Sequence, residues 1–366
     1  GIDLPSGTLD GRGAGTFSLT LPQGVAPTFD VDVALAGATV RVPALGWQKS
    51  AGSGGTLRLS GALTKPVRVD RIALDGPGLS LAGRLNLTQS GLAGAELSRL
   101  SLGSWLDAPV RWSAANGGRV TIDGGRVDLR AGLPPSASGT GPVLELSGTE
   151  VVVSDAIRLT SFRGQIASGR AGADRFSGQV NGRVPISGVI GDNGQFYLQS
   201  NEGEGGAILG AAGLNRNVKG GTLRVSVAPN PGGPMRGTFS LQNATLINAP
   251  VMAQMLSDIS VIGLAERLSS SGINFRDAQG KFTIDGSRIY IQQARAVGSS
   301  LGITLDGIYD TRADALDLVG VVSPIYALNG IVLRVQGIGR LLGGRPGEGL
   351  LGANFRVTGR ASAPQV

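Results

Sequence analysis

The chain has 366 residues, of which 61 are glycine and none is cysteine or histidine, and its formal net charge is +7. Hydrophobic residues make up 41% of it and charged residues 16%, which excludes a disordered chain, and the glycines have no three-residue period, which excludes collagen. Without cysteine and histidine there are no disulfides, thiolate nucleophiles or imidazole bases, so we expect neither an enzyme nor a cofactor or metal site.

The basic residues are scattered along the chain and are not interleaved with aromatic residues. This pattern indicates a solvated, mildly basic surface and argues against a nucleic-acid partner. A mild attraction to anionic lipid head groups stays open.

Residues 1–130 read as one strand after another, with apolar and polar residues alternating. The clearest case is the set Leu79, Leu81, Leu85 and Leu87, which alternates with Ser80, Ala82, Arg84 and Asn86. Side chains at every second position share one face of a strand, so we expect one apolar face and one solvated face. Asp-Gly pairs favour tight hairpins, and we therefore predict hairpin turns and antiparallel neighbours at Asp10-Gly11, Asp75-Gly76, Asp123-Gly124, Asp285-Gly286 and Asp306-Gly307.

The middle of the chain begins with a proline-broken loop at 131–142, followed by strands over 143–228. Within it, the helix formers at 206–214 replace the alternation and predict a short helical turn. A second small and polar stretch, at 228–237, separates this part from the last segment, 238–366.

The period changes at about 250–271, where apolar residues recur at steps of three and four, as on one face of a helix. Pro250 suits its first turn and Gly272 its end. We predict one or two short helices that cap the sheet or contact a membrane or partner through Met252, Met255, Leu256, Ile259, Ile262, Leu264 and Leu268. Strands resume after it, with the apolar positions Phe282, Ile284, Leu301, Ile303, Leu305, Leu316 and Leu318.

Three features resemble functional motifs but have simpler explanations. The glycines of 11–15 lack a P-loop pattern and indicate a turn. Asp30 and Asp32 share the outward face of a strand, where a solvated face is a better explanation than an acid/base pair. Trp47 is best explained as an anchor in a core or an interface.

Several glycine-containing segments in a fixed order resemble the AsmA-like bacterial envelope proteins, in particular the C-terminal portion of the YhdP type, with the TamB type more distant. They are Leu45-Gly46-Trp47-Gln48-Lys49, Gly76-Pro77-Gly78-Leu79, Gly206-Ala207-Ile208-Leu209, Gly220-Gly221-Thr222-Leu223, Asn248-Ala249-Pro250, Gly298-Ser299-Ser300-Leu301-Gly302, Leu316-Asp317-Leu318-Val319-Gly320 and Val357-Thr358-Gly359-Arg360.

The resemblance implies a mostly β protein, in which a long twisted antiparallel sheet curls into an open hydrophobic groove. It implies a bridge-like scaffold that moves phospholipid between the inner and outer membranes, with acyl chains in the groove. It also implies a periplasmic location and an inner-membrane anchor on a segment absent from this chain. No catalytic residue comes with the resemblance.

Two other functions compete with lipid transport. One is a structural or assembly module of the envelope that binds a protein partner through sheet edges or the 250–271 helix. The other, less favoured, is a hydrolase that depends on the carboxylates of Asp30 and Asp32.

Overall fold

The protein is mostly β, as the sequence predicts, and consists of two compact units. The first comprises residues 1–153, 159–182 and 190–194, and the second residues 154–158, 183–189 and 195–366. The computed structural model describes residues 8–115, 118–131, 143–166, 174–191, 195–228, 230, 233–247, 272–299, 301–324, 353–361 and 363–365.

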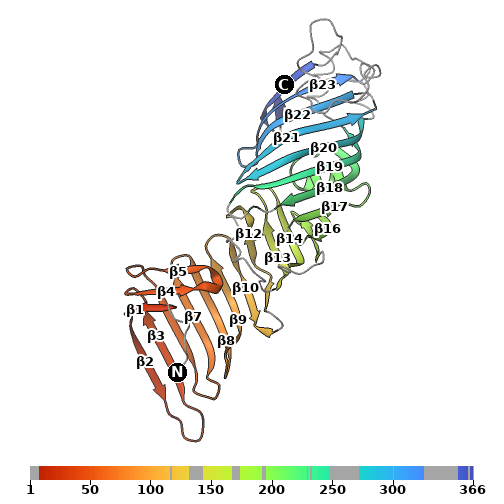
Figure 1. The fold of residues 1–366 in the computed structure, drawn as a ribbon. Helices are drawn as coiled ribbons and strands as arrows, with labels where there is room; N and C mark the ends of the chain where they lie inside the picture. Colours follow the sequence, from red (N-terminus) through yellow and green to blue (C-terminus); the bar gives the residue numbers. More distant parts are fainter. Residues whose placement is uncertain are drawn as a thin grey trace. The chain divides into compact units, whose positions relative to one another are not determined.

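The first unit is built on a sheet whose strands pair antiparallel in nearly sequential order (Figure 1). Its glycines and turn residues keep successive strands adjacent, as expected for a chain with frequent hairpin signals. In order across the sheet the strands are β2 (Ala14–Thr20), β3 (Thr28–Ala34), β6 (Thr56–Ala62), β7 (Arg68–Gly76), β8 (Leu79–Thr88), β9 (Gly91–Leu102) and β10 (Leu106–Ser113).

One position in this sheet breaks the antiparallel pattern. β11 (Arg119–Asp123) and β12 (Arg126–Asp128) both pair antiparallel with β10, and both pair parallel with β13 (Val143–Val152). Gly124 and Gly125 separate them with φ of +74° and +67°, a left-handed conformation that favours glycine. The expectation of antiparallel neighbours is therefore wrong for β13. The short 3₁₀ turn η3 (Leu129–Ala131) follows β12, and residues 132–142 of the predicted loop lie outside the described residues.

A small separate sheet accompanies the first one. It consists of β1 (Leu9–Gly11), β4 (Ala38–Val42) and β5 (Trp47–Lys49), paired antiparallel, with the 3₁₀ turn η1 (Pro43–Leu45) between the last two. Four further strands follow β13 in the chain: β14 (Arg158–Ile166), β15 (Asp174–Val180), β16 (Val184–Ile190) and β17 (Phe196–Gln199).

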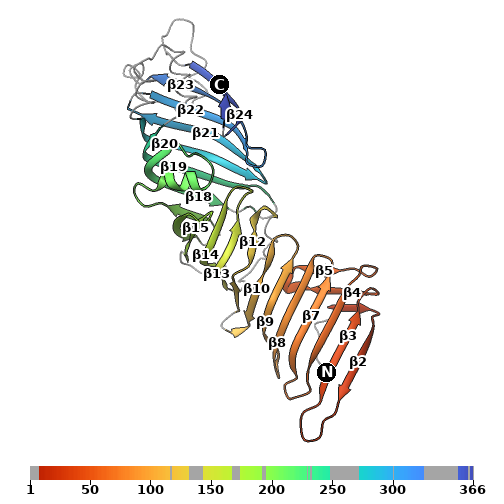
Figure 2. The same cartoon turned by 180° about the vertical axis from the view of Figure 1, so that it is seen from behind.

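The second unit is a curled sheet in which β17 and the strands after it pair antiparallel in sequence order (Figure 1). These strands are β18 (Val218–Ala228), β19 (Met235–Leu246), β20 (Ile273–Asp285), β21 (Arg288–Gly298), β22 (Leu301–Asp310), β23 (Ala315–Pro324), β24 (Ala353–Arg360) and β25 (Ala363–Gln365). Helix α1 (Gly205–Ala211) packs on β18 and β19 (Figure 2), which confirms the short helical turn predicted near 206–214.

The predicted Asp-Gly hairpins are mostly wrong. Asp285-Gly286 does open a two-residue loop, since Asp285 pairs with Arg288 across the β20–β21 hairpin. At the β7–β8 hairpin, in contrast, Gly76 is still paired, and Pro77 and Gly78 make the turn. A pairing partner on the next strand therefore overrides the local turn preference. The other pairs lie at strand positions or at the bulge before β12: Asp10-Gly11, Asp123-Gly124 and Asp306-Gly307.

Candidate functional site: two apolar sheet faces

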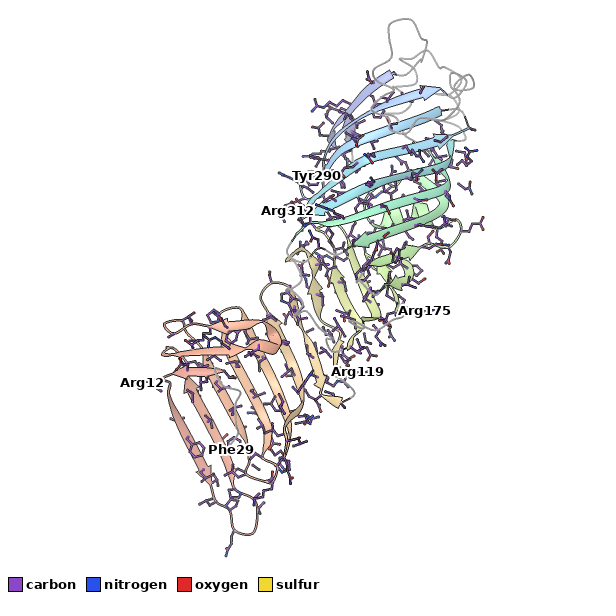
Figure 3. All side chains as sticks on the ribbon, in the orientation of Figure 1. Arg12, Phe29, Arg119, Arg175, Tyr290 and Arg312 are labelled. Atoms are coloured by element: carbon purple, nitrogen blue, oxygen red, sulfur yellow. The ribbon has the colours of Figure 1, made fainter. Side chains whose placement is uncertain are left out.

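One face of the first unit's sheet is apolar from strand to strand. Residues directly opposite each other on paired strands share a face, so the registers can be followed across the sheet. One row runs through Phe17, Val31, Leu59, Ile72, Gly83, Leu97, Val110, Ile122 and Leu146. The next row runs through Leu19, Phe29, Gly61, Val69, Leu85, Ala95, Trp112, Val120 and Leu144. We call this surface, with its continuation to Leu79 and Leu81, the first apolar face; Figure 3 labels Phe29 on it.

The opposite face of the same sheet is polar and carries ion pairs between neighbouring strands. Arg58 binds Asp32 at 3.1 Å, Arg99 binds Asp107 at 3.1 Å and Arg119 binds Glu145 at 2.8 Å. Two more pairs join Arg84 to Glu96 and Arg111 to Asp123. These pairs are exposed, so each stabilises the fold by at most about 1 kcal/mol. They show that this face is the solvated one, which confirms that Asp30 and Asp32 belong to a solvated strand face.

The small sheet covers one end of the first apolar face. Trp47 is buried against Gly76, and its Nε1 donates a hydrogen bond of 2.8 Å to the carbonyl of Pro77. Trp47 is thus a core anchor, as predicted. Lys49 is 2% exposed, and its ammonium donates to the carbonyls of Leu35 at 2.6 Å, Ala38 at 2.9 Å and Ser50 at 3.1 Å.

The small sheet covers only some of the predicted groove residues of this unit. Leu79 and Leu81 are buried at the covered end, with 3% and 8% of their surface exposed. Leu85 and Leu87 lie farther along the same face and are only half-buried. Toward the edge strand β2, Phe17 is 65% exposed. The first apolar face is therefore closed beside the small sheet and at other buried positions such as Val69 and Val110, which are 3% and 6% exposed. Lipid could contact only its half-buried and exposed residues.

The second unit has a corresponding apolar face. One row of directly paired residues runs through Phe196, Val227, Gly237, Phe282, Ile291, Gly307, Leu318 and Val357. Another runs through Leu223, Leu241, Ala278, Ala296, Ile303, Val322 and Ala353. We call these rows and the apolar residues between them the second apolar face.

Phenylalanine rings on this face lie over glycines of the next strand. A Cβ at Gly280 would come within 2.8 Å of the Phe239 ring, and one at Gly320 within 2.6 Å of the Phe355 ring. Phe282 occupies the corresponding space over Gly237. The missing side chains of these glycines are therefore replaced by aromatic rings, which restores packing at positions that would otherwise weaken a strand.

The second apolar face is also partly covered. At one end Gly205 and Gly206 bring α1 onto Leu241 and the backbone of β18. A buried cluster of Ile273, Phe275, Leu301 and Val322 forms the core, with Ile303 and Phe355 packed against it.

All the predicted groove residues of this unit lie on the second apolar face, and they differ in exposure. Leu301, Ile284 and Leu318 are buried, whereas Phe282, Ile303, Leu305 and Leu316 are half-buried. The predicted helix at about 250–271, with its contact residues, lies outside the described residues.

In the described part of the chain, contacts within the fold shift the pKa of several titratable groups. Asp128 is buried and accepts hydrogen bonds from Arg130 and Arg126. The bonds from Arg130 hold the pKa of Asp128 below its ordinary value, against the opposing effect of burial. Burial raises the pKa of Tyr309, with Asp314 adding to the rise. No metal-binding group of three acidic residues occurs among the residues described.

Comparisons with known proteins return nothing. Neither the scan against protein-family models nor the searches of curated proteins and of solved structures finds a match to this chain. In the described ranges, no helix has both the length and the apolar character needed to cross a bilayer.

Much of the two apolar faces was not identified from sequence. Val31, Leu59, Ile72 and Leu97 lie in the same row as Phe17, yet they come from separate strands whose registers the sequence does not give. The period-two alternation within each strand indicates which side chains share a face, but it does not give their partners on the neighbouring strands.

Proposed function

We propose that the chain is a bridge-like lipid-transport scaffold, in which phospholipid acyl chains lie along the open parts of the two apolar faces. The observation that carries this proposal is the continuity of the apolar rows from strand to strand, with an ion-paired face behind them. An ordinary sheet with one apolar face covers it with a second protein layer. Among the described residues, the small sheet and α1 cover part of each face, and other positions such as Leu85, Phe282 and Leu305 stay half-buried.

Hydrocarbon is a chemically suitable occupant for the uncovered part. Each methylene removed from water contributes about 0.8 kcal/mol, so shielding about ten methylenes contributes about 8 kcal/mol. Because the rows contain only aliphatic, aromatic and glycine residues, an acyl chain meets no polar barrier along a row. The resemblance to AsmA-like envelope proteins extends the proposal to phospholipid traffic between inner and outer membranes through the periplasm.

The experiment combines lipid analysis with matched charge substitutions. Leu85→Arg and Leu305→Asp put a charge on the half-buried apolar faces, whereas Asn86→Arg and Thr304→Asp put the same charge on the adjacent polar faces. We expect phospholipid to co-purify with the wild-type protein and with the polar-face variants. Lipid content and transfer of a fluorescent phospholipid between vesicles should fall in the apolar-face variants. Equal lipid content in all five proteins, with all of them folded, would contradict the proposal.

A second candidate function is a structural module that binds a partner protein through a sheet edge. The edge strand β2 favours it, because all its residues are exposed and the segment Ala14–Thr20 has no charge and no proline. Edges of this kind commonly pair with another strand. A photoreactive residue at Phe17 should then attach to protein, whereas one at Leu85 should attach to lipid under the first proposal.

A further inference from the structure

Outside the apolar faces, the polar face of the second unit carries two cations that have no acidic partner in the described part of the chain. Two neighbouring rows of directly paired residues contain them. The first contains Ser226, Thr238, Lys281 and Gln292, and the second contains Ala228, Arg236, Thr283 and Tyr290. Together with Gln195, Gly237 and Phe282 they line a hollow of about 670 Å³. Tyr290 is labelled in Figure 3.

Arg236 and Lys281 are both exposed and stand diagonally across β19 and β20. Diagonal neighbours are roughly 7–8 Å apart, so both side chains can reach one small ligand. Within the described residues neither side chain takes part in an ion pair or hydrogen bond. Asp285, in the next row, has no ion pair with them, and the nearby Arg288 is paired with Asp310 at 3.6 Å.

Most of the remaining lining residues carry hydroxyl or amide groups that can donate hydrogen bonds; the others are Ala228, Gly237 and Phe282. Gln195 Nε2 donates to Ser226 Oγ at 2.7 Å, and Tyr197 donates to Gln195 Oε1 at 2.8 Å, which fixes the amide and leaves the serine proton free to donate. None of the described residues that line the hollow is an acid.

The corresponding hollow on the polar face of the first unit is different. It is lined by Arg71, Arg84 and Arg111, but also by Asp70 and Glu96, and Arg84 is paired with Glu96. Arg111 is paired with Asp123, which lies beside it on β11. Carboxylates there occupy the guanidinium groups of Arg84 and Arg111, which would otherwise be available to an external anion.

We propose that the hollow between Arg236 and Lys281 binds a phosphate group. Arginine binds phosphate through two parallel hydrogen bonds and lysine adds a point charge, so the pair with its surrounding hydroxyls suits a phosphate ester. The site lies on the opposite face from the acyl chains of the proposed function and is independent of it. The phosphate can come from a free phosphate compound or from the head group of an anionic lipid.

The test uses two double variants that remove the same charge from the full chain. R236S/K281S removes both cations of the proposed site, and R84S/R111S removes two arginines from the hollow of the first unit. Two probes distinguish the sources: inorganic phosphate in a calorimetric titration, and vesicles of phosphatidylcholine with or without phosphatidylglycerol in a flotation assay. The double variant K281R/R236K keeps both charges and serves as the rescue.

We expect saturable binding by the wild-type protein, R84S/R111S and the rescue, with at least about tenfold weaker binding by R236S/K281S. Added salt should weaken the binding, because both cations are exposed. Binding of inorganic phosphate identifies a free phosphate compound, and binding only of phosphatidylglycerol vesicles identifies a lipid head group. Binding of neither probe, or an equal loss in both serine variants, would overturn the proposal.

Discussion

Phe282 on β20 lies directly opposite Gly237 on β19, and its ring fills the space that a side chain at position 237 would occupy. The same Cβ would also come within 2.5 Å of the Ser226 carbonyl oxygen, which belongs to the backbone of β18. Neither the ring nor the strand can move without disturbing the second apolar face.

Gly237→Ala should therefore destabilise the second unit by about 1–3 kcal/mol, the usual cost of adding atoms to a packed site. Urea unfolding measures the free energy. Gly54→Ala is the control, because nothing lies within 4 Å of the added Cβ and its φ is not left-handed, so it should be neutral or slightly stabilising. A neutral Gly237→Ala would show that the ring is not held over this glycine.

Lys49→Met should destabilise the small sheet. The substitution keeps most of the side chain's length but removes the ammonium that donates to the carbonyls of Leu35 and Ala38. The Leu35 carbonyl keeps the amide of Ala38 as a donor, so we expect a loss of about 1–3 kcal/mol in total. Amide hydrogen exchange in β4 and β5 and the free energy of unfolding both report the loss. Lys219→Met, at an exposed position, should change stability by no more than about 0.5 kcal/mol. Unchanged exchange rates in Lys49→Met would contradict the role given to this ammonium.

The Asp128 carboxylate should make the first unit sensitive to acid. Hydrogen bonds from Arg130, and then from Arg126, lower the pKa of Asp128 in the folded protein below its ordinary value of 3.8. Its contribution is therefore complete above that value and is lost as the pH falls through the lower, folded pKa.

Asp128→Asn should cost about 2 kcal/mol at neutral pH, because charge-assisted hydrogen bonds to two arginines are weakened. The stability difference between wild-type and variant, followed by chemical unfolding from neutral to acidic pH, should shrink at acidic pH. Asp107→Asn, which breaks an exposed pair with Arg99, should show little change at any pH. A difference that stays constant with pH would contradict the assignment.

The sequence predicts the composition of the faces better than their geometry. In β8 the alternation from Leu79 to Leu87 is uninterrupted, and all four predicted leucines share the first apolar face. In β9 the apolar positions shift parity between Leu97 and Leu100, because a bulge inserts one residue opposite Ala82 and Gly83. Such a bulge moves every later side chain to the other face unless the sequence shifts with it.

The polar partners and the covering layers were not predictable in the same way. Lys49 reads as a surface residue by composition, yet its hydrogen bonds to three carbonyls depend on a fold that brings Leu35 and Ala38 beside it. The parallel pairing of β13 likewise depends on the path of residues between β12 and β13, which local propensity does not fix. Both features depend on contacts between segments that are distant in the sequence, and the local sequence does not specify those contacts.

The open edge of the first apolar face gives the final prediction. Leu19 and Phe29 are directly paired on β2 and β3, but Phe29 is 7% exposed and Leu19 is 44% exposed. Phe29→Ser should cost about 3–5 kcal/mol, as large-to-small changes of a buried aromatic residue do. Phe17→Ser, at a side chain that is 65% exposed, should cost less than about 1 kcal/mol. Thermal and urea unfolding of the two variants measure the difference. Because the two substitutions are identical, an equal cost would show that another layer covers β2, and the face would then be closed where we propose that acyl chains lie.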